Sequence, residues 1–171
     1  MALMETVKGR RSIRKYSPEE VPMEVVEELL EAARWAPSAG NRQPWHFYVV
    51  TEEPQRRALV EVAGGQGFIA EAPVVIIICA DAERSAEKYG DRGRSLYCLQ
   101  DTAAAVQNIL LAAEARDLGT CWIGAFDEKA CSSVLDLPAN HRPVAMTPVG
   151  WKGMDPDPRA RRDLEEIVTY L

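Results

Sequence analysis

One uninterrupted apolar run, V-V-I-I-I-C-A at residues 74–80, restricts the folds open to this chain more than any other feature. A strand with one face in water alternates apolar and polar residues, whereas this run has no polar position. The run therefore predicts a strand with both faces covered. Helical patterns precede and follow it, which favours an α+β or three-layer fold with helices on both sides of a sheet. The order of the strands does not follow from these patterns.

Periodicity and the positions of Gly and Pro place the other elements. Val26, Leu29 and Ala33 recur at helical spacing opposite a glutamate-rich face, which predicts a helix over residues 22–36. Residues 82–94 are polar and contain glycine, which predicts a loop or lid. We further predict helices at 2–8, 54–63 and 96–116, a short helix after Asp127, and strands at 46–51, 120–123 and 144–150.

Length and composition limit the classes of protein to which this chain can belong. The 171 residues predict a single domain, residues 1–171, that buries a core without disulfides. The net charge of −6 argues against nucleic acid and anionic membranes as partners. No apolar run approaches the roughly 20 residues of a membrane span, and no signal peptide is apparent, so we expect a cytoplasmic protein. The four cysteines lack close spacing, which predicts buried thiols and no metal site.

Two short basic segments stand near the two ends of this acidic chain. Arg10, Arg11, Ser12 and Arg14 form the first, and R-A-R-R at residues 159–162 forms the second. In an extended segment residues 10, 12 and 14 share one side, so two guanidinium groups and a hydroxyl face the same way. Such a set binds a phosphate dianion through charge-assisted hydrogen bonds. A solvated basic turn remains the alternative for each segment.

Two further segments have the composition of a ligand site. P-S-A-G-N-R-Q-P-W at residues 37–45 combines turn formers with two amides and a hydroxyl, which suits a planar heteroaromatic ring. L-G-T-C-W-I-G at residues 118–124 has glycines that let the backbone approach a ligand closely. An ordinary helix-to-strand turn and a helix C-cap glycine are the alternative interpretations.

The order and spacing of these motifs resemble the nitroreductase superfamily of FMN-dependent oxidoreductases. The resemblance covers about residues 5–169 and rests on R-R-S-I-R, P-S-A-G-N-R-Q-P-W, E-A-P-V-V-I-I-I-C-A, D-L-G-T-C-W-I-G and P-R-A-R-R-D-L-E-E-I-V. It implies an α+β fold, namely a three-layer α/β/α sandwich with a mixed, mainly antiparallel central sheet. It also implies an intertwined homodimer with FMN at the subunit interface.

The resemblance assigns roles to individual residues. Arg10, Ser12 and Arg14 would bind the FMN phosphate and ribityl chain, and Arg11 would lie near the pyrimidine edge of the flavin. The other implied contacts are Pro37, Ser38, Asn41 and Gln43 from the partner subunit, Gln66 near the ring, Ile123 and Gly124 with a backbone N–H facing N5, and Arg159 and Arg161 around the phosphate.

The implied activity is hydride transfer from NAD(P)H through flavin N5 to a nitroaromatic, a quinone or a similar small acceptor, by ping-pong exchange. The chain is short for the family, and residues 82–94 are all that it has in place of a larger helical insertion over the flavin. Tyr89 and Tyr97 would reach the site from there. The alternatives are flavin fragmentation, reductive dehalogenation, a non-catalytic flavin-binding or redox-sensing module, and a nucleic-acid binder that uses the first basic segment.

Overall fold

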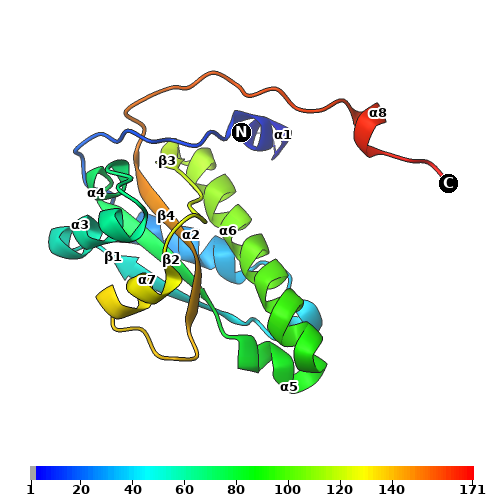
Figure 1. Cartoon of the computed structure of the whole chain (residues 1–171). Coiled ribbons are helices and arrows are strands. Elements are labelled where there is room, and N and C mark those ends of the chain that lie inside the picture. The colour runs from blue at the N-terminus through cyan, green and yellow to red at the C-terminus, as the bar shows by residue number, and fades with distance from the viewer. Residues whose placement is uncertain (1–2) are drawn as a thin grey trace.

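A four-stranded antiparallel sheet forms the centre of the molecule (Figure 1). The computed structural model describes residues 3–171, so Ala2, the first residue of the predicted N-terminal helix, lies outside the described residues. The strands stand in the order β1-β2-β4-β3, and each neighbouring pair is antiparallel. They are β1 (Trp45–Val50), β2 (Val74–Ala80), β3 (Leu118–Thr120) and β4 (Arg142–Trp151).

Strand β2 is buried on both faces, as its sequence predicts. Its alternate residues enter two different cores, because successive side chains of a strand point to opposite sides of the sheet. Val74, Ile76 and Ile78 pack in the first core, and Val75, Ile77 and Cys79 pack in the second. The run at residues 74–80 therefore holds two helical layers on one sheet.

Helices α2 (Met23–Arg34) and α6 (Cys98–Ala115) cover the first face of the sheet. The apolar stripe of α2 is fully buried against α6 and the sheet. Asn108 of α6 donates a hydrogen bond of 2.8 Å from its side-chain amide to the Ala32 carbonyl of α2. Helix α1 (Leu3–Gly9) lies beside the C-terminal part of α6.

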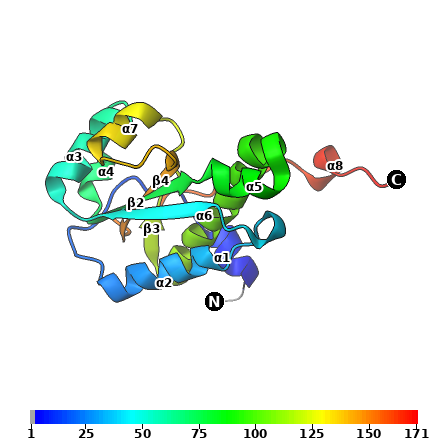
Figure 2. The same ribbon diagram turned by 90° about the horizontal axis from the view of Figure 1, so that it is seen from below.

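Helices α3 (Glu53–Val62), α4 (Phe68–Glu71) and α7 (Glu128–Val134) cover the second face. Leu59, Ile69 and Cys131, one from each helix, are fully buried there. Figure 2 shows α2 on one side of the strands and α3 and α7 on the other. The predicted three-layer α+β sandwich is thereby confirmed.

The prediction of a loop at residues 82–94 is wrong. Residues there form helix α5 (Ala82–Arg92), which a π-helical turn (Gly93–Tyr97) joins to α6. The Asp81 side chain caps α5 by accepting a hydrogen bond of 3.1 Å from the Arg84 N–H. Gly90, with a φ of 56° and a ψ of −139°, is not helical and divides the segment at a kink into two helical pieces. The segment is polar because much of α5 faces solvent, so composition alone misidentified it.

The strand predicted at residues 120–123 is displaced toward the N-terminus, because β3 ends at Thr120. Ile123 makes only a single bridge to Met146, with backbone hydrogen bonds of 2.9 and 3.0 Å. The other predicted elements differ from the structure by a residue or two at their ends. All four cysteines are free and buried, as predicted.

After β4 the chain leaves the body of the molecule. Residues 152–171, here called the C-terminal arm, pass beside α1 and end well away from the sheet (Figure 1). The arm contains the single turn α8 (Leu164–Ile167), and residues 157–171 are all exposed. Among residues 3–171, no helix has the length and apolar character needed to cross a membrane.

Candidate functional site

The first basic segment lies along the edge of the sheet. The Ile13 N–H donates a hydrogen bond of 2.8 Å to the Thr120 carbonyl, and Ser12 forms a parallel bridge with Thr120 of β3. The Ile13 side chain is 1% exposed and anchors the segment. Because neighbouring residues of an extended segment point to opposite sides, Arg14 faces away from the core.

The start of the C-terminal arm runs beside this segment. Tyr16 forms an antiparallel bridge with Lys152, and the Gly153 N–H donates a hydrogen bond of 2.9 Å to the Lys15 carbonyl. The Arg14 N–H lies 3.4 Å from the Met154 sulfur. These contacts bring the two ends of the chain together.

A cleft of about 640 Å³ opens between the two basic segments. Its lining includes Lys8, Arg10, Arg11, Ser12, Arg14, Met154, Asp157, Arg159 and Arg161. The convergence that the sequence predicts for residues 10–14 and 159–161 is therefore present in the folded chain.

The cleft carries unbalanced positive charge. Within residues 3–171, no carboxylate lies within ion-pair distance of Arg10, Arg14, Arg159 or Arg161, and Asp157 is the single acidic residue of the lining. Several exposed arginines elsewhere do pair with carboxylates, as in the ion pairs of α2 and α3. Guanidinium groups without carboxylate partners bind a phosphate in the bidentate manner that suits it. Arg161 Nη1 also donates hydrogen bonds of 2.9 and 3.1 Å to the carbonyls of Arg159 and Ala160.

Arg11 lines the cleft, but its guanidinium caps helix α1. Its Nη1 donates hydrogen bonds of 2.6 and 2.8 Å to the carbonyls of Lys8 and Gly9 at the end of that helix. Cations at this position also interact favourably with the helix dipole. The implied role of Arg11 near a flavin edge stays a prediction.

In the segment after β3, the backbone N–H of Ile123 is used within the sheet, whereas that of Gly124 is open in the described part of the chain. The Ile123 N–H donates a hydrogen bond of 2.9 Å to the Met146 carbonyl, and the Ile123 side chain is buried. The Gly124 N–H has no acceptor among residues 3–171, and Gly124 is exposed. A Cβ at Gly124 would meet only the Trp122 ring nitrogen, at 3.9 Å. A planar ligand therefore has access to the backbone at Gly124 and not to the N–H of Ile123.

Gln66 lies outside the lining of this cleft. Its side-chain amide donates a hydrogen bond of 3.0 Å to the Ala63 carbonyl at the end of α3. Two residues later, the Phe68 ring lies 6.0 Å from the guanidinium carbon of Arg14. Contact between Gln66 and a flavin stays a prediction.

The loop at residues 37–43 lies at the other end of helix α6. The Ala39 N–H donates a hydrogen bond of 3.1 Å to Oδ1 of Asp101, in the first turn of α6. The first basic segment instead follows Gly9, where an added Cβ would lie 2.9 Å from Oε1 of Glu114 in the last turn. At 1.5 Å per helical residue, Asp101 and Glu114 are about 20 Å apart along the axis. The single chain therefore does not bring Pro37, Ser38, Asn41 and Gln43 to its own cationic cleft.

This loop has a defined and strained conformation. The Ser38 hydroxyl accepts a hydrogen bond of 3.0 Å from the Gln43 N–H, and Gln43 Nε2 lies 3.3 Å from two oxygens of Asn41. Asn41 and Gln43 have φ values of 55° and 51°, which side chains disfavour. Such conformations cluster at active sites and ligand sites, where the surrounding structure maintains them.

Two features that the sequence did not reveal hold the loop in place. Arg42 Nε donates to the Arg84 carbonyl at 2.8 Å, and Arg84 Nε donates to the Arg42 carbonyl at 2.6 Å, which fastens the loop to α5. Asp101 is 7% exposed, and burial raises the pKa of its carboxyl. The available signal was an acidic residue in the first turn of a mostly apolar helix.

Comparison with known proteins agrees with this architecture. Residues 7–66 and 53–151 match the model of the nitroreductase family. The chain is 32% identical over 188 residues to an NADH dehydrogenase of Thermus thermophilus, covering 94% of this chain and 92% of that one. It is 31% identical to the oxygen-insensitive NADPH nitroreductase of Salmonella typhimurium, covering 96% of this chain and 72% of that one. The NADPH:FMN oxidoreductase of Vibrio harveyi, solved with NAD+, superposes with a TM-score of 0.89 at 26% identity, over 98% of this chain and 76% of that one.

Proposed function

This chain belongs to the nitroreductase family, and from this membership we propose that it binds FMN and uses it to pass hydride from NAD(P)H to a nitroaromatic, a quinone or a similar small acceptor. One observation carries the proposal: arginines from both ends of the chain line one cleft without internal carboxylate partners. In a chain of net charge −6, such a cleft is a specific anion site and not part of a generally basic surface.

The residues of the cleft suit the phosphate end of FMN. Arg10 and Arg14 offer guanidinium donors from one wall, and Arg159 and Arg161 offer them from the other. The Ser12 hydroxyl supplies a neutral donor between them. Bound FMN would supply the hydride-transfer chemistry that no side chain of this protein provides.

Gly124 is the residue that we assign to flavin N5. Its backbone N–H is free of an acceptor in the part of the chain that the structure describes, whereas that of Ile123 is used within the sheet. A fixed N–H aimed at an atom that gains charge stabilises the reduced cofactor at no cost in reorganisation. Ile123 would then line the flavin with its backbone only.

The active form in this proposal is a homodimer. The strained loop at residues 37–43 lies about 20 Å along α6 from its own cleft, so it would contact the flavin of the partner. The loop would present Pro37, Ser38, Asn41 and Gln43 to that ring.

The C-terminal arm supports the same assembly. No strand within residues 3–171 pairs with the outer edge of β1, and a groove of about 550 Å³ between α2 and β1 follows that edge. The arm exposes Leu164, Ile167 and Tyr170. Apolar residues on an extended arm and an unpaired strand edge both require cover, and the arm of a second copy would supply it.

The two substrates would use one face of the flavin in turn. NAD(P)H would bind and leave before the acceptor enters, which is a ping-pong sequence. Helix α5 stands beside the loop at residues 37–43 and would limit the size of the molecule that enters from the partner's side.

An absorbance spectrum of the purified protein, followed by anaerobic titration with NADH and with NADPH, tests this proposal. We expect a yellow dimer with one FMN per chain that either nicotinamide bleaches and a nitroaromatic or quinone restores. Colourless protein that fails to take up added FMN would contradict the cofactor assignment. Bound FMN that neither nicotinamide reduces would favour a redox-sensing module, and a stable monomer with stoichiometric FMN would rule out the shared site.

A further inference from the structure

Helix α5 presents two side chains to the loop that we assign to the partner's flavin. A Cβ built on Gly40 would collide with the Tyr89 hydroxyl and would lie 2.7 Å from Lys88 Nζ. The tips of both side chains therefore lie against Gly40, in the middle of the loop. Any molecule stacked on a flavin next to this loop comes within reach of them.

Behind these tips lies an aromatic pair flanked by cations, here called the Tyr89–Tyr97 platform. The two rings meet edge to face with centroids 5.1 Å apart. Lys88 Nζ lies 5.4 Å from the centroid of the Tyr89 ring. Arg92 lies 5.3 Å from the centroid of the Tyr97 ring and donates a hydrogen bond of 2.9 Å to the Tyr97 hydroxyl. The platform thus combines ring surface with two positive charges.

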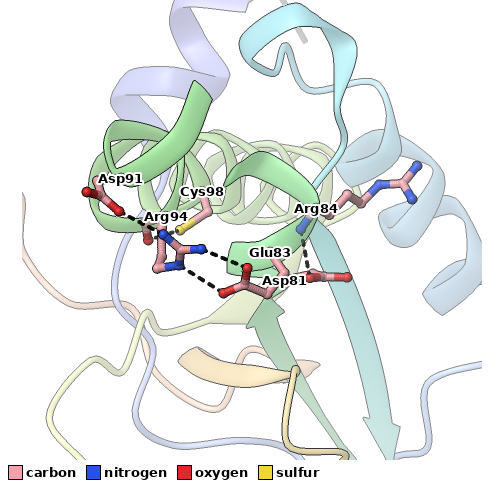
Figure 3. Close-up of polar contacts among 6 residues, drawn as sticks. All are labelled: Asp81, Glu83, Arg84, Asp91, Arg94 and Cys98. Carbon is pink, nitrogen blue, oxygen red and sulfur yellow. Dashed lines mark hydrogen bonds and ion pairs between the residues drawn. The ribbon is translucent and has the colours of Figure 1, made fainter. Parts of the chain in front are cut away.

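The carboxylates around the platform already form ion pairs with arginines. Figure 3 shows Arg94 bridging Glu83 and Asp91. Its guanidinium nitrogens lie 2.8 Å from a carboxylate oxygen of each. Glu87 pairs with Arg42 of the loop. Within residues 3–171, no carboxylate lies within ion-pair distance of Lys88 or Arg92. These two cations are available to an external anion.

The fold keeps the platform in one position. The Arg94 clamp ties the π-helical turn to the first turn of α5, and Cys98 Sγ donates to the Arg94 carbonyl at 3.0 Å (Figure 3). Gly93 packs so closely on α5 that an added Cβ would lie 2.8 Å from the carbonyl carbon of Ser85. Turns of π-helix are common at functional sites, and here the turn carries Tyr97.

We propose that the Tyr89–Tyr97 platform selects aromatic acceptors that carry a carboxylate, with Lys88 pairing with the carboxylate and the tyrosine rings contacting the aromatic body. This inference rests on the proposed function, because Gly40 must lie beside the partner's flavin. A charge-assisted hydrogen bond is stronger than a neutral one, so the carboxylate gains more from Lys88 than an uncharged amide does.

Two matched substrates separate the effect of the carboxylate charge from the effect of the aromatic ring. We would measure kcat/KM of the FMN-loaded dimer for 4-nitrobenzoate and for 4-nitrobenzamide, and compare their ratio between variants. Lys88→Met should lower the ratio of acid to amide by about tenfold, and Lys88→Arg should restore most of it. Lys129→Met, which removes an exposed cation from α7, is the control and should keep the wild-type ratio.

A binding measurement without turnover completes the test. Benzoate and benzamide, which have no reducible nitro group, would be titrated into the oxidised protein while the flavin absorbance is followed. Lys88→Met should raise the Kd of benzoate by about tenfold and leave that of benzamide within about twofold.

The possible outcomes distinguish failure of the carboxylate selectivity from failure of the proposed oxidoreductase function. Equal losses for acid and amide, or an unchanged ratio, would overturn the inference while the oxidoreductase remains. A loss confined to reduction by NADPH, with NADH unaffected, would assign Lys88 to the nucleotide phosphate and would also overturn it. A wild-type protein that takes up no FMN would contradict the proposed function itself.

Discussion

Replacing Gly119 with Ala tests how closely the first basic segment must lie against β3. An added Cβ would lie 2.8 Å from Cγ2, 2.9 Å from Cβ and 3.0 Å from Cγ1 of Ile13. Ile13 is 1% exposed, and its N–H is donated to Thr120 at 2.8 Å, so it cannot move aside without lengthening that hydrogen bond. The new methyl group therefore pushes the whole segment away from the strand.

The expected cost is that of overpacking a filled core, about 1–3 kcal/mol. For a domain of this length each 1 kcal/mol lowers Tm by about 2–4 °C, so we expect a decrease of about 2–12 °C. The displaced segment carries Arg10 and Arg14, so affinity for FMN should fall together with stability.

Thermal unfolding of the FMN-free variants measures the stability change without the contribution of the cofactor. Gly67→Ala is the matched control, because nothing lies within 4 Å of its added Cβ and its φ of −56° suits any residue. The control should be neutral, or stabilising by up to about 1 kcal/mol. If Gly119→Ala left Tm within about 1 °C of the wild type, the close packing of Ile13 on β3 would be refuted.

Three further changes test other parts of the structure. Arg14→Ala should weaken FMN binding by more than about tenfold in equilibrium dialysis, since a charge-assisted hydrogen bond contributes about 1.5–3 kcal/mol. The control Arg57→Ala on α3 should leave the affinity for FMN unchanged. If the two variants bound FMN equally well, Arg14 would not belong to the phosphate site. Asp127→Ala removes hydrogen bonds of 2.9 and 3.0 Å to the first turn of α7 and should cost about 1 kcal/mol in urea unfolding, most of which Asn should restore. Burial raises the pKa of Cys79 to about 12 and that of Cys131 to about 11. The folded protein keeps these protons above about pH 8.5, where the unfolded chain loses them. The free energy of unfolding should therefore fall as pH rises above that value, and a flat urea midpoint between pH 7.5 and 9.5 would contradict the assigned burial.

Local sequence was sufficient where one physical requirement dominated. The apolar run of β2 needs cover on both faces, so two helical layers followed from it without further information. The stripe of α2 likewise fixed which face of that helix is buried. The alternation of residues 10–14 placed Arg10, Ser12 and Arg14 on one side of an extended segment, and all three line the cleft.

Local sequence failed where a residue outside the element supplied the stabilising contact. Helix α5 reads as a loop because its glycine and polar residues are poor helix signals, while Arg94, beyond its end, ties it together through Glu83 and Asp91. The role of Asp101 was also missed, since its partner Ala39 is distant in sequence.

The amino-acid sequence by itself determined most of the elements, the buried faces of β2 and α2 and the kinds of groups at the site, because these depend on spacing along a few turns of helix or a few residues of strand. The tertiary structure alone decided the strand order, the separation of the 37–43 loop from its own cleft, and the pairing of the N-terminal segment with both Thr120 and Lys152. The physical reason is that a phosphate site requires several arginines within a few ångströms of one another, and only long-range backbone pairing places residues from opposite ends of a chain at that distance.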